Sequence, residues 1–390
     1  MRNKTTPHAQ GVTTRAGPAG SVLVGLGHAL SVWIQHQANL LFLLPAVLML
    51  VFLSVFPLFV SLYLSLIRFQ FAPGGFTLTF VGLTNYRKLI FGIEREHFLG
   101  LLARPSLGTG IVLAVIVAAS ALLLVRYLRN SQFSLAGLLG RGLFALIGGG
   151  LAWLLIRVLV PGGRPGTLFT TIIYVVVGVA VQYGLGLGLA FLCSQDIAWR
   201  RLFRVVFLLP MMITPVGIAY TFRILMDLGK GPFAPIWRAM GLAEVSWVNN
   251  PWGARIVVMI GDIWQWFPFM FIVLLAALES QPVELLEAAM VDGASRWQTF
   301  WKVTWPQIIP VTSTLVLIRL IEAFKIIDLP NVLTNGGPGT ATESLTLHAF
   351  IAWRTLDIGG SAAVAYILLL VVTFSAIAYV NFVHRRLAEL

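Results

Sequence analysis

The chain has 390 residues, of which 58% are hydrophobic and only 11% are charged. Its mean hydropathy of +0.88 corresponds to more apolar surface than the core of a soluble protein could bury, which excludes an ordinary soluble domain. The net charge of +12, from 27 basic and 15 acidic residues, is typical of membrane proteins with cytosolic loops near anionic lipid and favours nucleic acid much less.

Long apolar runs predict an all-α integral membrane protein, a multi-span helical bundle with about eight transmembrane helices. Backbone polar groups cannot stay unpaired in hydrocarbon, and unbroken apolar runs favour helices over the alternating strands of a barrel. A helix needs about 20 apolar residues to cross the bilayer. On this basis the predicted spans are Leu40–Leu66, Leu107–Val125, Leu138–Val160, Leu168–Cys193, Leu202–Leu225, Ala254–Leu278, Gln307–Leu329 and Ser361–Val383.

These spans divide the chain into four regions. They are a cytosolic N-terminal arm at 1–38, a first span with an extracytoplasmic loop at 39–100, two further spans at 101–165, and a core domain at 166–390. An even number of spans places both termini on one side. Basic clusters in alternate short loops favour the cytosol for that side, although basic residues such as Arg87 leave the totals nearly balanced.

The loop at about 280–306 has an ordered pattern of its own. Pro282 suits the first position of a helix, and Glu287 complements its positive N-terminal end. One apolar face is formed by Leu285, Leu286, Ala289 and Met290. Gly293 can end this helix, while Ser295 with Gln298 forms a capping box for the next one. The pattern predicts a helix–turn–helix at the membrane surface, either a simple connection or a docking element.

Charged residues inside predicted spans indicate faces that avoid lipid. The seventh span contains four at a spacing of three: Arg319, Glu322, Lys325 and Asp328. They can pair along the helix. A central charge costs about 3 kcal/mol, whereas a large apolar residue contributes only about −0.5 kcal/mol, so this face should meet protein or water. The same holds for Asp262 in the sixth span, and both an ion-pair ladder and a substrate path remain open.

The segment from Glu287 to Ala294 resembles the EAA loop of binding-protein-dependent ABC importer permeases of type I. In that family the loop is a coupling helix that sits in a groove of the cytosolic ATPase. The resemblance therefore implies that the ATPase-coupling residues are Glu287, Ala288, Ala289, Asp292, Gly293 and Ala294.

Two further stretches are similar to the carbohydrate and polyol branch of this family, which includes maltose and glycerol-phosphate importers. They are Thr334–Pro338 with Thr342, and Val81–Tyr86, both expected on the extracytoplasmic side. The region 101–165 departs from the six spans that are common in the family. We interpret it as a peripheral helical pair, in which the glycines at 148–150 could allow close helix contact.

The resemblance implies a permease subunit of an ATP-driven importer in the bacterial or archaeal plasma (inner) membrane. The solute would be a sugar or sugar-like compound, such as a polyol, an oligosaccharide or glycerol phosphate. The implied partners are a second permease subunit, two cytosolic ATPase subunits and an extracytoplasmic solute-binding protein. Because this chain has no Walker sequence, it should be non-catalytic and bind no cofactor, with ATP and Mg at the ATPases.

A sugar path should combine hydrogen-bonding groups with aromatic faces. The candidate substrate-path residues are Tyr220, Asp262, Trp264, Gln265, Trp266, Glu322, Lys325 and Asp328. The six histidines lack HxxxH or HExxH spacing, and the single cysteine cannot form a cluster, so no metal site is predicted. An alternative is a self-sufficient transporter in which Glu322 and Asp262 carry protons, but this leaves the EAA loop unexplained.

Overall fold

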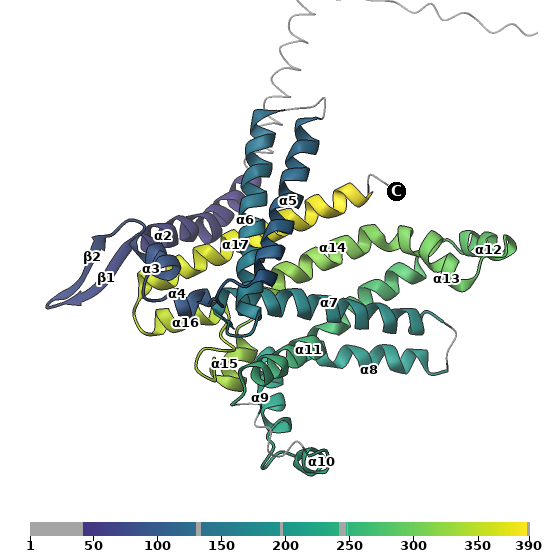
Figure 1. The fold of residues 1–390 in the computed structure, drawn as a ribbon. Helices are drawn as coiled ribbons and strands as arrows, with labels where there is room; N and C mark the ends of the chain where they lie inside the picture. The colour runs from purple at the N-terminus through teal and green to yellow at the C-terminus, as the bar shows by residue number, and fades with distance from the viewer. Residues whose placement is uncertain (1–41, 130–133, 196–197, 242–246, 248, 388–390) are drawn as a thin grey trace, which may run out of the picture. The chain divides into compact units, whose positions relative to one another are not determined.

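The computed structural model describes residues 42–129, 134–195, 198–241, 247 and 249–387 (Figure 1). The predicted arm at 1–38 lies outside these residues. Internal contacts divide the chain into two compact units, 1–63 and 64–390, and each is described by itself. The described residues contain seven helices long and apolar enough to cross a membrane, or eight if one bent pair counts as a span. This confirms the predicted helical membrane bundle.

The first candidate span runs from Phe42 to Ser65 and begins in the first unit. It contains one π-helical turn, η1 (Val51–Val55), followed by α2 (Phe56–Ser65). Pro57 lies directly after this turn and has no backbone N–H. A wider turn lets the chain pass the proline without ending the helix, because the proline ring would otherwise crowd the carbonyl four residues earlier.

The second unit opens with a β-hairpin, where the sequence predicted only a loop. Strands β1 (Ile67–Ala72) and β2 (Gly75–Phe80) pair in antiparallel register. Two short helices follow, α3 (Thr84–Phe91) and α4 (Arg95–Phe98). The buried Asn85 donates through Nδ2 to the carbonyls of Ser65 (2.8 Å) and Ile67 (2.9 Å). This residue of the Val81–Tyr86 stretch therefore fixes the start of the hairpin.

Two long antiparallel helices occupy the region between α4 and the core. They are α5 (Leu107–Leu128) and α6 (Leu135–Leu159), which pack against each other (Figure 1). At their base β3 (Gly100–Leu101) pairs with β4 (Arg164–Pro165). A Cβ on Gly149 would lie 2.9 Å from Ile116 Cγ2, so this glycine permits the close helix contact. The pair leaves and rejoins the chain at one point.

Three long helices form the centre of the second unit. They are α7 (Thr167–Cys193), α11 (Pro251–Glu279) and α14 (Trp305–Ala323), and all three pack against one another. A Cβ on Gly186 would lie only 2.5 Å from Met270 Cβ, which shows how closely α7 approaches α11. Buried side chains such as Phe169, Phe271 and Leu315 fill the space between these helices. The last helix, α17 (Ile358–Leu387), packs beside α14.

The predicted span Leu202–Leu225 is not one straight helix. It consists of α8 (Arg200–Met212) and α9 (Pro215–Leu225), which meet at an angle of 97°. The break follows from Pro215, because the residue before a proline avoids the helical region. Thr214 is accordingly extended and its side chain caps the new helix at Gly217 N.

The predicted span Gln307–Leu329 is shifted toward the N-terminus. The helical rod begins with α13 (Arg296–Thr299) and a π-helical turn, η2 (Phe300–Thr304), and α14 then ends at Ala323. It stops because side chains of a later segment bind the next carbonyls: Thr346 donates to Phe324 O (3.2 Å) and Ser344 to Ile326 O (2.6 Å). The remaining helices are α10 (Ala234–Ala239), α12 (Val283–Val291), α15 (Asp328–Thr334) and α16 (Leu345–Arg354).

Candidate coupling loop and intramembrane site

The helix α12 connects α11 and α13 and corresponds to the predicted docking element (Figure 1). Pro282 is its N-cap residue, one position before the predicted start. The helix ends in a Schellman motif, in which Ala294 N donates to Ala289 O (3.0 Å) and Gly293 N to Met290 O (3.1 Å). Gly293 has a φ of +75°, which a non-glycine residue adopts only at a cost. The glycine thus sets the direction in which the chain leaves α12.

A capping box begins the next helix, as the sequence predicted. Ser295 Oγ accepts from Gln298 N (3.3 Å), and Gln298 Oε1 accepts from Ser295 N (2.8 Å). At the other end of the loop Gln281 Nε2 donates to Thr304 O (3.1 Å). Both ends of the loop are therefore fixed by hydrogen bonds, which holds α12 in one orientation.

The surface of α12 is largely uncovered within this chain, since none of its residues is buried. Leu286 and Ala289 are half-buried, whereas Leu285 and Met290 are exposed. The predicted apolar face is thus divided between the chain and the outside. Val291, 88% exposed, continues the outward side. Exposed apolar residues in a rigid short helix are typical of an interaction surface.

A buried polar cluster lies between the three central helices. Arg319 on α14 donates from Nη2 to both carboxylate oxygens of Asp262 on α11 (3.0 and 2.8 Å), and from Nε to Oε1 of Gln182 on α7 (2.8 Å). Gln182 Nε2 also donates to Asp262 Oδ2 (2.8 Å). The guanidinium lies 4.9 Å from the ring centroid of Trp266. Every charge in this cluster has a partner, as a low-dielectric environment requires.

The four charges predicted to form a ladder separate into different environments. Arg319 does not pair with Glu322 but with Asp262, across helices. Glu322 does bind Lys325 (2.8 Å), but both side chains are more than half exposed. Asp328 lies in the first turn of α15. The ladder along one helix is wrong because α14 ends at Ala323, which places Lys325 and Asp328 beyond it.

The other residues predicted for a substrate path are similarly divided. Gln265 is buried and its amide lies 3.5 Å from Ile213 O. Trp264 and Tyr220 are exposed to 36% and 54%, and Trp264 packs edge-on against Phe222. The described residues therefore bring Asp262 and Trp266 into the polar cluster, with Trp264 and Tyr220 left accessible. Sequence reasoning missed Gln182, although a single amide within a long apolar run was a signal.

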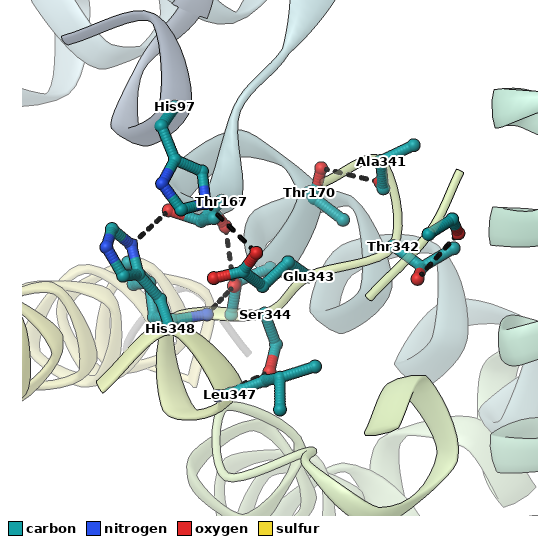
Figure 2. Close-up of polar contacts among 12 residues, drawn as sticks. His97, Thr167, Thr170, Ala341, Thr342, Glu343, Ser344, Leu347 and His348 are labelled. Atoms are coloured by element: carbon teal, nitrogen blue, oxygen red, sulfur yellow. Dashed lines mark hydrogen bonds and ion pairs between the residues drawn. The ribbon is translucent and has the colours of Figure 1, made fainter. Parts of the chain in front are cut away.

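The Thr334–Pro338 stretch forms a tight turn that neighbouring helices hold in place (Figure 2). Thr342 Oγ1 contacts Thr334 Oγ1 (2.6 Å) and donates to Gly337 O (3.1 Å). Tyr174 on α7 donates to Thr342 O (3.1 Å). Arg255 on α11 donates from Nε to Ala341 O (2.7 Å). The turn is thereby fixed to the ends of α7 and α11.

Comparison with known proteins places these features in a family. Residues 182–389 match the family described as binding-protein-dependent transport system inner membrane component. The trehalose/maltose transport system permease protein MalF of Thermococcus litoralis is 32% identical over 213 residues, which cover 55% of this chain and 72% of that protein. The sn-glycerol-3-phosphate transport system permease protein UgpA of Yersinia pseudotuberculosis is 30% identical over 224 residues, 56% of this chain and 75% of that protein.

A solved structure supports the fold. The chain resembles one from a bacterial alginate ABC transporter in complex with an alginate pentasaccharide-bound periplasmic protein, with a TM-score of 0.52 and 21% identity. The match covers 57% of this chain and 78% of that one. At this identity the likeness concerns the arrangement of helices.

Proposed function

Because the chain belongs to the family of binding-protein-dependent transport system inner membrane components, we propose that it carries a sugar-like solute across the inner membrane and couples to its ATPase through α12. The chain is a non-catalytic, multi-pass permease subunit of a binding-protein-dependent importer. A second permease subunit, two ATPase subunits that bind ATP and Mg, and an extracytoplasmic binding protein complete the proposed assembly. Both termini are assigned to the cytosol.

The geometry of α12 supports its role in coupling. The helix presents exposed apolar side chains, and its ends are fixed by the Schellman turn and by hydrogen bonds to neighbouring residues. A rigid connection between α11 and α14 can transmit a displacement of α12 to the two helices that contain Asp262 and Arg319. The proposed contact residues are Glu287, Ala288, Ala289, Asp292, Gly293 and Ala294.

A sugar-like solute is supported by the names of the relatives, which refer to trehalose, maltose and glycerol 3-phosphate. The accessible aromatic residues Trp264 and Tyr220 offer flat apolar faces of the kind that bind sugar rings. The proton-coupled alternative has less support. Its two proposed carriers, Asp262 and Glu322, are each paired with a cation, so neither is a free carboxylate that could exchange a proton along a path.

The single observation that carries the coupling proposal is the exposed helix that ends at Gly293. We expect Gly293→Glu to leave the protein inserted and assembled but to reduce solute-stimulated ATP hydrolysis at least tenfold. The strained backbone changes the exit from α12, and a new charge enters the contact. ATP hydrolysis by the purified complex in nanodiscs, with and without solute-loaded binding protein, measures this.

A matched control is Gly241→Glu, because Gly241 is also exposed, has a φ of +69° and has open space around it. This variant should retain stimulation. Gly293→Asn should retain it as well, since asparagine tolerates the left-handed conformation. Normal stimulation in an assembled Gly293→Glu complex would remove the coupling role. Thermal shift of the binding protein with trehalose, maltose and glycerol 3-phosphate then tests the solute class separately.

A further inference from the structure

Two histidines and a glutamate from distant parts of the chain meet beside the N-terminus of α7 (Figure 2). His97 belongs to α4, Glu343 precedes α16, and His348 lies within α16. One ring nitrogen of each histidine and one carboxylate oxygen lie within 4.8 Å of one another. The shortest contact joins His97 Nε2 to Glu343 Oε2 at 3.0 Å. These are three groups that bind metal ions, gathered at one position.

The glutamate has an unused oxygen in this cluster. The Glu343 side chain is only 4% exposed, and Oε1 has no hydrogen-bond partner among the described residues. Leaving a buried carboxylate oxygen without a partner is costly. The Thr334–Pro338 turn and α16 position Glu343 from both sides, so it cannot simply turn to solvent. This arrangement favours a positively charged partner that the protein itself does not supply.

The second histidine is oriented in the manner of a metal ligand. His348 Nδ1 lies 3.2 Å from Thr167 Oγ1, and metal-binding histidines commonly hold their second nitrogen in such a hydrogen bond. When Nδ1–H donates to Thr167, Nε2 carries the free lone pair. Burial, together with the neighbouring His97, lowers the pKa of His348 to about 3. The imidazole is therefore neutral near pH 7, which is the form that binds metals.

We propose that His97, Glu343 and His348 bind one zinc ion. Two imidazoles and a carboxylate form a donor set that zinc accepts, with a water in the fourth position. The His97 side chain is 30% exposed and provides the side from which the ion and its water enter. A hard cation such as magnesium would instead select oxygen ligands.

Binding requires a small rearrangement. The two imidazole rings are now stacked, with centroids 4.3 Å apart and planes 24° from parallel, and tetrahedral zinc with bonds of about 2.0–2.1 Å places its ligands about 3.3 Å apart. The exposed ring of His97 must turn so that its lone pair points at the ion. The zinc would then join α4, at the base of the α5–α6 pair, to α16. We assign it a structural role that fixes these two segments.

The test uses the full-length protein purified in detergent without a polyhistidine tag and treated with a chelator. We expect calorimetry to show one zinc ion bound per chain, and Co²⁺ to give the visible absorption bands of a tetrahedral nitrogen–oxygen site. His97→Gln, at an accessible position, and Glu343→Gln, which keeps the side-chain shape, should each weaken zinc binding at least tenfold. Zinc should also raise the Tm of the unaltered protein.

Glu96→Gln is the matched control, because Glu96 is an exposed residue of the same helix and does not belong to the cluster. Its zinc affinity should not change. Absence of zinc binding to the unaltered protein, or equal affinity in folded His97→Gln, would overturn the proposal. A Tm that responds to acidification but not to zinc would assign the cluster to a proton-sensitive contact instead and would also overturn it.

Discussion

The helices α5 and α11 are both apolar enough to span a membrane, but they occupy opposite environments within the chain. Buried residues make up 44% of the apolar window of α11 and only 6% of that of α5 or α6. The less buried helix α5 is the more apolar one, with a hydropathy of 2.5 against 1.8. Hydropathy therefore identifies a span but not its neighbours. In the central helices the neighbours are indicated by polar residues that need a partner.

The sharpest test of this comparison is to remove one charge from the central cluster. Arg319→Met leaves the buried Asp262 carboxylate without its cation, which costs about 3–5 kcal/mol in comparable buried pairs. We expect a large loss of monodisperse protein and a lower Tm, both measured in detergent. Lys325→Met, which breaks the exposed Glu322–Lys325 pair, is the control and should have little effect.

Replacing both charges, with Asp262→Leu and Arg319→Met together, should recover most of the lost stability. Gln182 then still donates to the backbone carbonyl of residue 262, which lies 3.2 Å away. If the double variant is less stable than both single variants, the cluster is not a simple charge pair. A stable double variant with altered solute preference would place these residues in the substrate path.

The opposite prediction applies to α5 and α6. Replacing residues 102–163 by Asn-Gly should join β3 to β4 as a tight hairpin, because Leu101 and Arg164 already face each other across the ladder. The loss is limited to contacts such as the burial of Val158 and the stacking of Phe144 on Phe374 at 4.7 Å. We expect a cost of about 3 kcal/mol, seen as a lower Tm, with assembly and transport retained. An assembled variant without transport would contradict the peripheral interpretation.

The smallest effect is expected at the exposed pair. Exchanging Glu322 and Lys325, by Glu322→Lys with Lys325→Glu, preserves a pair that is worth about 0.5 kcal/mol or less at the surface. The Tm and the transport rate should both remain close to those of the unaltered protein. A strong defect in this exchange would show that one of the two side chains has a specific contact in the assembled importer.

The sequence allowed prediction of features that depend on local pattern. Apolar run length located the spans, and the Gly293 turn and the Ser295 capping box appear where residue type predicted them. The hairpin at 67–80 was missed although its alternating residues surround Pro-Gly-Gly, a local turn signal. The bend at Thr214 was missed because one apolar run hid the effect of Pro215.

Contacts between distant segments could not be predicted in this way. Gln182 and Arg319 meet through packing of α7 on α14, and the sequence instead suggested pairing of Arg319 along its own helix. His97 and Glu343 are separated by 246 residues, so no short metal-binding motif exists to find. The outer end of α14 likewise depends on Ser344 and Thr346, which belong to another segment.

The most direct test of the central claim, that α12 contacts the ATPase, is site-specific cross-linking. The single cysteine, Cys193, is buried and can be removed as Cys193→Ala. Ala288→Cys, exposed on α12, should then cross-link to the ATPase subunit with a short bifunctional reagent, with a yield that changes when ATP binds. The control Gln70→Cys, exposed on β1, should give no such product. Equal yields at the two positions in an assembled, ATP-hydrolysing complex would contradict the account.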